Sequence, residues 1–569
     1  MAKMLTIDPA FSLPLSSEWG LIVSEAGRYA RGLTVSVGLS NGTLQTVEQV
    51  VLTDPAERQA FALLVSYRTG LSAASVEPRM LEIFDQVEQR LRDQAEESEA
   101  GHVSQATRLV ELVHEAGIDL FHTPDDKAYG SITVDGHVEN YPLHVRGFRR
   151  RLARLFYMAE GKSPGAQAIQ DALAVLDGQG IGDGPELPVY VRLAEDAGNI
   201  YLDLCNDTWQ AVEVTATGWS VIDICPVKFR RMPGMLPLPV PQKGGTLADL
   251  RPFLNLGTDS DWHLVAHWLI AALRPRGPYP ILVVYGGHGS AKSTLVRVLR
   301  AFVDPNVAPL RLPPRDVQNV AIAANNSWIV AYDNMSHLPD WLSDALCCVA
   351  TGLGFATRSL YTDDDEALFQ AMRPIVINGI EEVATRGDFL DRALTVHLPP
   401  MTPQAVKDEE TFWSEMERAR PQILGALLDI VSAGLKALPT VKLTSMPRMA
   451  DFAKWSNATA TACGWSAQEF DTAYKDVRES THTLTLEASL LWPPLDALMQ
   501  TQTIWNGTPT QLLAALTTRV DERTQKQQEW PKKPNVFTNQ LRRLVPTLKE
   551  VGIMVKITPG RNRMIEIKK

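Results

Sequence analysis

The stretch from residue 280 to residue 299, PILVVYGGHGSAKSTLVRVL, decides the fold of the central part of the chain. Residues 280–285 form an uninterrupted apolar run, which is typical of a strand buried on both faces of a parallel sheet. A glycine-rich stretch follows, and residues 295–299 carry apolar side chains at helical spacing. Strand, glycine-rich loop and helix, with Lys-Ser where the helix begins, is the pattern of a phosphate-binding loop.

The chemistry of this loop follows from its residue types. The candidate nucleotide-binding residues are Gly286, Gly287, His288, Gly289, Ser290, Ala291, Lys292, Ser293 and Thr294. Backbone N–H groups of such a loop converge on phosphate oxygens, and the helix amino terminus adds positive charge. Lys292 is expected to reach the β and γ phosphates, and the Ser293 hydroxyl to ligate Mg²⁺, so ATP and Mg²⁺ are the expected cofactors.

One loop position departs from the usual pattern, because Ala291 stands where glycine normally precedes the lysine. Alanine is tolerated there at little cost if its φ is negative, and at a larger cost if its φ is positive.

Three polar residues follow downstream at the ends of apolar strands. Residues 328–332 are a second buried strand that ends in Asp333, a candidate holder of a Mg²⁺-bound water. Asn334 stands where many ATPases place the glutamate that polarises the attacking water, and an amide cannot accept that proton. A third strand, residues 374–377, ends in Asn378, which is placed to contact the γ-phosphate or the water.

Two arginines, Arg386 and Arg392, lie beyond the last of these strands. An arginine near a subunit boundary can stabilise charge on the phosphate of a neighbouring subunit. We prefer Arg392 for this role; the alternative is a local pair with Asp388 or Asp391.

In this order, the loop, the Tyr332-Asp333-Asn334 strand end, the Asn378 strand end and the motif at 388–392 resemble the AAA+ ATPases of phages, plasmids and integrated elements. These ATPases are related to superfamily-3 helicases and poxvirus-type primase-helicases. The resemblance covers most of the chain after about residue 106. It implies a ring, often a hexamer, with ATP between subunits and a DNA strand in the channel.

In superfamily-3 helicases a basic β-hairpin between the second and third motifs enters the channel. The corresponding residues 355–366 contain one arginine, Arg358, and an acidic turn of four carboxylates, which would repel phosphates. Arg358 is therefore a candidate for contact with DNA, and contact with a neighbouring subunit is an equal alternative.

The last hundred residues suggest three helices (486–499, 509–519 and 535–551) and a hairpin at 553–567, which together describe a winged helix. Residues 531–569 carry ten basic side chains against two acidic ones, a net charge of +8 that leaves −19 for the rest of the chain. The candidate DNA contacts there are Lys532, Lys533, Arg542, Arg543, Lys556, Arg561 and Arg563. The total net charge of −11 excludes only a uniformly basic coat.

We therefore expect an α/β multidomain protein with a P-loop core of AAA+ type. Its parts are an amino-terminal α/β region (1–105), an α+β domain (106–255), the ATPase core (256–400), a helical lid (401–480) and the winged helix (481–569). Residues 232–245, rich in proline and glycine, mark a boundary. The arginine cluster at 146–154 is most simply a solvated helix face.

Five scattered cysteines without a CxxC pair predict reduced thiols in the cytoplasm, and no apolar run is long enough to predict a membrane span. The leading hypothesis is a ring-forming DNA helicase of a mobile element that hydrolyses ATP. The alternative is an ATP-dependent switch, assembly or defence protein that binds DNA without unwinding it. A third possibility is a degenerate primase-like or protein-docking module within residues 1–255.

Overall fold

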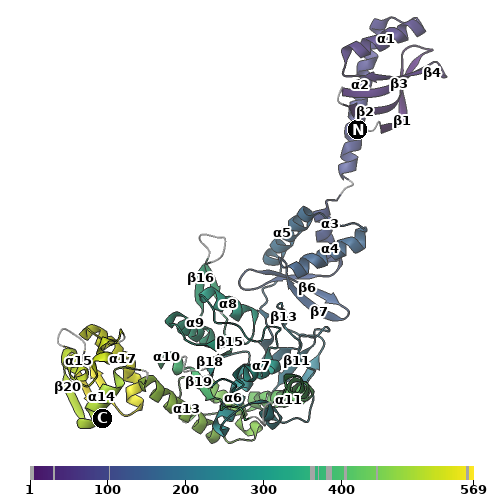
Figure 1. Cartoon of the computed structure of the whole chain (residues 1–569). Helices are drawn as coiled ribbons and strands as arrows, with labels where there is room; N and C mark the ends of the chain where they lie inside the picture. The colour runs from purple at the N-terminus through teal and green to yellow at the C-terminus, as the bar shows by residue number, and fades with distance from the viewer. Residues whose placement is uncertain are drawn as a thin grey trace. The chain divides into compact units, whose positions relative to one another are not determined.

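The computed structural model of the chain describes residues 5–29, 32–100, 103–358, 366–369, 371–379, 387–402, 407–443, 446–487, 489–528, 530–558 and 563–569 (Figure 1). The chain divides into two compact units. The first comprises residues 1–111 and 156–172, and the second comprises residues 112–155 and 173–569. Each unit is described by itself.

The first unit contains an antiparallel sheet in which four consecutive strands are neighbours. Its strands are β1 (Leu5–Pro14), β2 (Gly20–Tyr29), β3 (Gly32–Ser40) and β4 (Leu44–Val51). Helices α1 (Pro55–Thr69) and α2 (Ala73–Ala100) follow, and Asp54 caps the start of α1 by accepting a hydrogen bond from the Ala56 amide. Alternate β3 residues Leu33, Val35 and Val37 join Val65 and Ile83 of the two helices in one core.

Two antiparallel sheets follow in the second unit. One has the order β5-β6-β7 (Asp119–His122, Ala128–Val134, His137–Pro142). The other has the order β12-β11-β10-β9 (Gly218–Ile222, Ala211–Thr215, Asn199–Asp203, Leu193–Asp196), and β8 (Val189–Tyr190) pairs with β13 (Lys228–Phe229). Helices α3 (Gln105–Glu115), α4 (Arg146–Glu160) and α5 (Ala166–Gly182) each contribute residues to both units. Residues 105–229 therefore contain both antiparallel sheets and helices.

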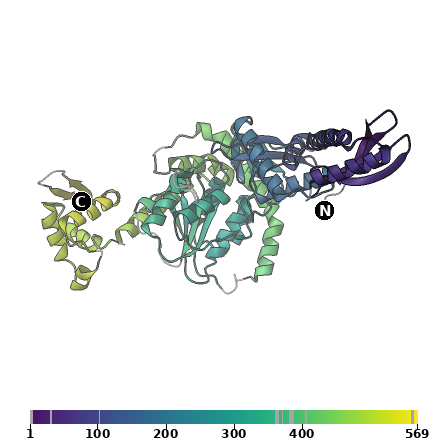
Figure 2. The ribbon, with the colours of Figure 1, turned by 90° about the horizontal axis from the view of Figure 1, so that it is seen from above.

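The centre of the second unit is a parallel sheet of four strands in the order β15-β18-β14-β19 (Figure 2). The strands are β15 (Val330–Met335), β18 (Ile375–Gly379), β14 (Ile281–Tyr285) and β19 (Ala393–His397). The three apolar runs expected as buried strands are thus confirmed as neighbours, and all five residues of β14 are buried. The chain is a multidomain α/β protein with a parallel sheet.

Each face of this sheet packs against a different set of helices. Leu282 and Val284 of β14 face one core with α6 (Asp259–Ala272), α7 (Lys292–Val303) and α11 (Glu409–Ala437). Ile281 and Val283 face a second core with α8 (Val317–Asn326) and α9 (Asp340–Thr351). The first core also includes residues of strands β9 to β11, so the antiparallel sheet at 193–222 shares a core with these helices.

The segment 232–245 contains no helix or strand, as its prolines and glycines predict, yet it is packed against the unit. Leu238 is 3% exposed, and its amide donates to the Leu204 carbonyl. The Leu236 amide donates to the Pro305 carbonyl. The segment is therefore a fixed connection within the second unit.

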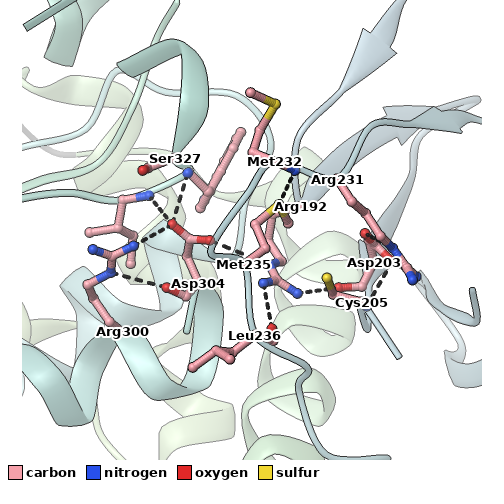
Figure 3. A network of polar contacts seen from close by, with 12 residues as sticks. Arg192, Asp203, Cys205, Arg231, Met232, Met235, Leu236, Arg300, Asp304 and Ser327 are labelled. Carbon is pink, nitrogen blue, oxygen red and sulfur yellow. Dashed lines mark hydrogen bonds and ion pairs between the residues drawn. The ribbon is translucent and has the colours of Figure 1, made fainter. Parts of the chain in front are cut away.

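A buried ionic network lies beside this connection (Figure 3). Asp304, at the end of α7, accepts hydrogen bonds from Arg300 at 2.9 Å and from the amides of Trp328 and Ile329 at 3.0 and 3.1 Å. Its other oxygen lies 3.6 Å from Arg192 Nε, and Arg192 donates to the carbonyls of Asp203 and Leu236. Because a buried charge needs a partner, this network fixes the end of α7 to the segment that enters β15.

After the parallel sheet the chain is mainly helical, with α11 followed by α12 (Ala450–Ala460) and α13 (Ala467–Glu487). Within the described residues, Glu409–Thr440 is the one segment with the length and mean hydropathy (1.5) of a membrane span, but 56% of that window is buried inside the protein. Such burial is typical of a core helix.

The carboxy-terminal region contains α14 (Trp492–Thr501), α15 (Pro509–Thr517), α16 (Glu522–Lys526) and α17 (Pro534–Glu550). Its antiparallel sheet has the order β20-β22-β21, formed by Ile504–Gly507, Ile565–Lys568 and Met554–Ile557. The three expected helices and the hairpin are confirmed, and β20 and α16 are additional elements. All five cysteines are free thiols.

Candidate functional site

The glycine-rich loop runs from β14 into α7 and is held by its own side chains. Lys292 Nζ donates to the carbonyls of Gly286 and Gly287 at 2.7 and 2.8 Å, and Ser290 Oγ donates to the Gly287 carbonyl at 2.9 Å. A Cβ at Gly286 would lie 2.5 Å from Ser290 Oγ and 2.9 Å from the Leu398 carbonyl oxygen, so only glycine fits there. Residues 287–289, including His288, are exposed. The loop therefore offers exposed backbone beside a cation that can pair with an anion.

Ala291 adopts a positive φ, which is the costlier of the two conformations considered for this position. Its φ is 62° and its ψ is 29°, a left-handed conformation that costs an L-residue about 1 to 2 kcal/mol. Its side chain makes no capping hydrogen bond at the start of α7. The residue that departs from the usual glycine is therefore a site of backbone strain.

The loop lies next to the end of β15, where two oxygen ligands meet. Ser293 Oγ donates to both carboxylate oxygens of Asp333, at 3.1 and 3.2 Å. Burial lowers the pKa of Lys292, and the Asp333 carboxylate opposes this shift. No group of three or more His, Cys, Asp and Glu side chains that could hold a metal occurs among the described residues. A Mg²⁺ ion here would use Ser293, Asp333 and phosphate oxygens, a ligand set that suits it.

A β-bulge at the end of β15 sets the orientation of the next residue. Tyr332 pairs with Ile377 and Met335 with Gly379, so two residues of β15, Asp333 and Asn334, face one residue of β18. Asn334 takes a φ of 57° and is exposed, and its backbone N–H donates to Asn378 Oδ1 at 2.8 Å. Bulges of this kind redirect side chains at functional sites. The sequence predicts the strand end but gives no signal for the bulge.

Asn378 is 1% exposed, and its Nδ2 has no hydrogen-bond partner within the described part of the chain. It lies opposite Val284 of β14, next to the strand end from which the loop starts. A buried amide with unused donors is costly unless a ligand or water accepts from it. Its position is consistent with contact to an anion at the loop.

Arg392 is half-buried, and its Nη1 donates to the backbone carbonyl of Asp388 at 2.6 Å. Asp391 forms an ion pair with Arg448 at 3.4 Å. Arg386 lies outside the described residues. Arg392 is therefore anchored locally through a neutral acceptor, and its role at a subunit boundary stays a prediction.

The expected hairpin after α9 is present as β16 (Phe355–Arg358) and β17 (Glu366–Phe369), with Arg358 paired to Glu366 in the register. The other three carboxylates of the acidic turn, Asp363, Asp364 and Asp365, lie outside the described residues. The contact of Arg358 with DNA or with a neighbour stays a prediction.

A pocket of about 470 Å³ adjoins the loop, and no sequence pattern predicts it. It is lined by residues of three segments: Pro252, Phe253, Leu254, Asn255, Ala291, Thr294, Leu295, Arg297, Met401, Lys407, Glu409, Phe412 and Trp413. The Phe253 and Phe412 rings meet edge to face at 5.8 Å. The pocket combines aromatic and aliphatic side chains with polar and charged ones, and small-molecule sites use such polar groups to orient a ligand.

Two polar groups organise this pocket. Asn255 Nδ2 donates to the Ser290 carbonyl at 3.0 Å and to the Pro399 carbonyl at 2.7 Å, so it ties the loop to the segment after β19. Arg297 stacks on the Trp413 ring at 4.4 Å and forms an ion pair with Glu409 at 2.7 Å. Except for Asn255 with Ser290, these contacts join residues more than 100 positions apart, and no local pattern predicts them.

The basic residues of the carboxy-terminal region lie on its surface. Those expected to contact DNA and present in the structure are Lys532, Lys533, Arg542, Arg543, Lys556 and Arg563, and all six are exposed. Arg561 lies outside the described residues. Lys568 and Lys569 pair with Glu566 and Asp496, so part of the basic excess is neutralised within the region.

Known proteins provide an independent comparison. Residues 247–480 match the sequence model of the actinomycete integrative conjugative element replication protein, and residues 494–569 match that of the RepA C-terminal domain of such elements. No match was found among the curated proteins.

Two solved structures of the NrS-1 C-terminal region resemble the chain weakly. An A form apo structure is 13% identical, covers 81% of this chain and 98% of its own, and has a TM-score of 0.37. A further apo structure is 12% identical, covers 82% and 99%, and has a TM-score of 0.36. Likenesses this weak carry no argument about fold or activity. The two matched regions, 247–480 and 494–569, place this chain in a replication-protein family of mobile elements.

Proposed function

We propose that this chain is an ATPase of AAA+ type that acts as a ring-forming DNA helicase during replication of a mobile element. The observation that carries the proposal is the meeting of Ser293 with Asp333 beside Lys292, at the carboxyl ends of parallel strands. In open α/β sheets, ligands bind at this edge. The strand order, with β14 between β18 and β19, supports the same assignment.

In this proposal the loop amides and Lys292 bind the β and γ phosphates, and Ser293 and Asp333 hold Mg²⁺. Bound Mg²⁺ neutralises charge on the phosphate oxygens. The buried Asn378 amide donates to the γ-phosphate or the attacking water. The adjoining pocket takes the base and ribose between Phe253 and Trp413, because aromatic walls favour a flat ring.

The carboxy-terminal region is proposed to be a winged helix that grips DNA. Six exposed basic side chains support this, since cations on one small domain attract phosphates. DNA is the proposed partner of the whole assembly, which is a hexamer working in the cytoplasm.

The decisive test is turnover and binding of ATP by Lys292→Ala. We expect loss of hydrolysis and of fluorescent-nucleotide binding, because the ammonium that pairs with the phosphates is removed. The matched control is Lys436→Ala, which removes an exposed lysine from the last turn of α11. Full activity of Lys292→Ala would refute the site.

A second function has an observation in its favour. The Asn334 side chain cannot accept a proton, and its backbone N–H donates to Asn378 Oδ1. This favours an ATP-dependent switch that assembles on DNA without unwinding it. Strand displacement on a forked duplex, measured beside DNA-stimulated hydrolysis, separates the two functions. Stimulated hydrolysis without displacement would favour the switch.

A further inference from the structure

Helix α4 separates its side chains into two faces. Phe148, Leu152 and Phe156 are buried. The opposite face carries four exposed arginines: Arg146, Arg149, Arg150 and Arg154. At about 100° per residue they lie within about 140° of the helix circumference, so they form one continuous cationic face. We call these four residues the α4 arginine face.

A fifth arginine of the same helix, Arg151, is paired with a carboxylate of the fold. Arg151 pairs with Glu139 of β7, a carboxylate that also accepts a hydrogen bond from the Tyr141 hydroxyl at 2.7 Å. The side chain of Glu139 is only 9% exposed, and these partners hold the pKa of its carboxyl below its ordinary value against the effect of burial. Arg151 is therefore neutralised within the fold.

The α4 arginine face has no such partner. None of its four side chains makes an ion pair or hydrogen bond with the described residues. The helix contains one acidic residue, Glu160, and this residue pairs with Arg108 at 3.0 Å. The positive charge of this face is therefore uncompensated, in a chain whose residues outside the carboxy-terminal tail sum to −19.

The arrangement is unfavourable for the helix itself. Arg146, Arg150 and Arg154 follow one another at i,i+4 spacing, where like charges repel. Arg146 and Arg149 also lie in the first turn, where the helix dipole disfavours cations and no acidic residue is present. A merely solvated face, which the sequence alone suggested, would be more stable with mixed signs. An external polyanion removes both penalties.

We propose that the α4 arginine face binds the phosphates of a single DNA strand, as a contact separate from the carboxy-terminal basic region. Guanidinium groups bind phosphate oxygens through paired hydrogen bonds. The row from Arg146 to Arg154 is about 12 Å long, at 1.5 Å per residue, which suits one strand along the helix. The choice of DNA rests on the proposed function; the cationic face itself does not.

The test counts phosphate contacts through salt dependence. Anisotropy of a labelled 20-nucleotide single strand is measured with the full chain from about 50 to 400 mM NaCl. The variant is R146Q/R149Q/R150Q/R154Q, and the matched control replaces the same four residues by lysine, which keeps the charge. Each lost contact lowers the slope of log K against log salt by about 0.7 on a single strand.

The glutamine variant is expected to lower the slope by up to about 2.8, and the lysine variant to leave it near the wild-type value. An unchanged slope in the glutamine variant overturns the proposal. If four changes disturb folding, R150Q/R154Q with an unaltered circular dichroism spectrum should lose about half as much. Because this assay contains no ATP, its failure leaves the ATPase proposal intact, and failure of Lys292→Ala leaves this one intact.

Discussion

Replacing Ala291 by glycine should stabilise the second unit, which reverses the usual effect of this substitution. Ala291 has a φ of 62° at the start of α7. The left-handed conformation costs alanine about 1 to 2 kcal/mol, and glycine adopts it freely. Glycine loses about 0.5 to 1 kcal/mol more backbone freedom on folding. The difference is a gain of about 0.7 kcal/mol in the free energy of unfolding.

The assay is urea unfolding followed by tryptophan fluorescence, because Trp268 and Trp328 lie 1% and 2% exposed in the core that includes α7. The control is Ala433→Gly, in the interior of α11, where glycine should lower stability by about 0.5 to 1 kcal/mol. The two substitutions should therefore shift the midpoint in opposite directions at the same m value. A loss of stability in Ala291→Gly equal to that of Ala433→Gly would refute the strained conformation.

Three further predictions concern other parts of the chain. Asn255→Leu removes the donors to Ser290 and Pro399 and should raise KM for ATP roughly tenfold, since two hydrogen bonds are lost; an unchanged KM would show that Asn255 does not position the loop. Burial lowers the pKa of His267 to about 3, whereas the same side chain in the unfolded chain takes up a proton below about pH 6.5. The free energy of unfolding therefore falls as the pH is lowered. Between pH 6.5 and 5.0 His267 should account for about 1.6 kcal/mol of this loss, which His267→Phe abolishes and exposed His114→Gln retains; equal slopes would contradict this. R542Q/R543Q should lower the salt slope for forked duplex by up to about 1.8, and an unaffected slope would remove these residues from the DNA contact.

The parts of the fold that the sequence predicts are those set by local patterns. The apolar runs at 281–285, 330–332 and 375–377 specify buried parallel strands because each is long enough and uninterrupted. Strand β1, Leu5–Pro14, has no clear sequence pattern, because Pro9 interrupts it. An edge strand tolerates a proline whose nitrogen faces away from the partner strand, and β1 is at the edge of its sheet.

The sequence predicts the residues of the site that lie in local motifs, but not those brought together by the fold. Glycines, Lys292 and Ser293 are adjacent in sequence, and Asp333 and Asn378 follow recognisable strands. The pocket and Asn255 depend on contacts between residues far apart, for example Asn255 with Pro399. The positive φ of Ala291 depends on the loop closing around Ser290, which residue type alone does not reveal. The arginines of α4 were judged from a helix pattern that carries no information on their partners.

The network around Asp304 has a mechanical consequence. Helix α7 begins at Lys292 and ends beside Asp304. The backbone amides of Trp328 and Ile329 donate to the Asp304 carboxylate, and the chain then leads into β15 and on to Asp333. Asp304 thus joins one end of the helix to the segment that precedes the strand, while Ser293 and Asp333 lie near the other ends of the helix and the strand. Arg192, which directly precedes β9, also pairs with Asp304, so a rotation of α7 relative to β15 at this junction would change the distance between Ser293 and Asp333. A displacement of the antiparallel sheet that follows Arg192 would therefore be transmitted through this junction to the distance between the Ser293 hydroxyl and the Asp333 carboxylate.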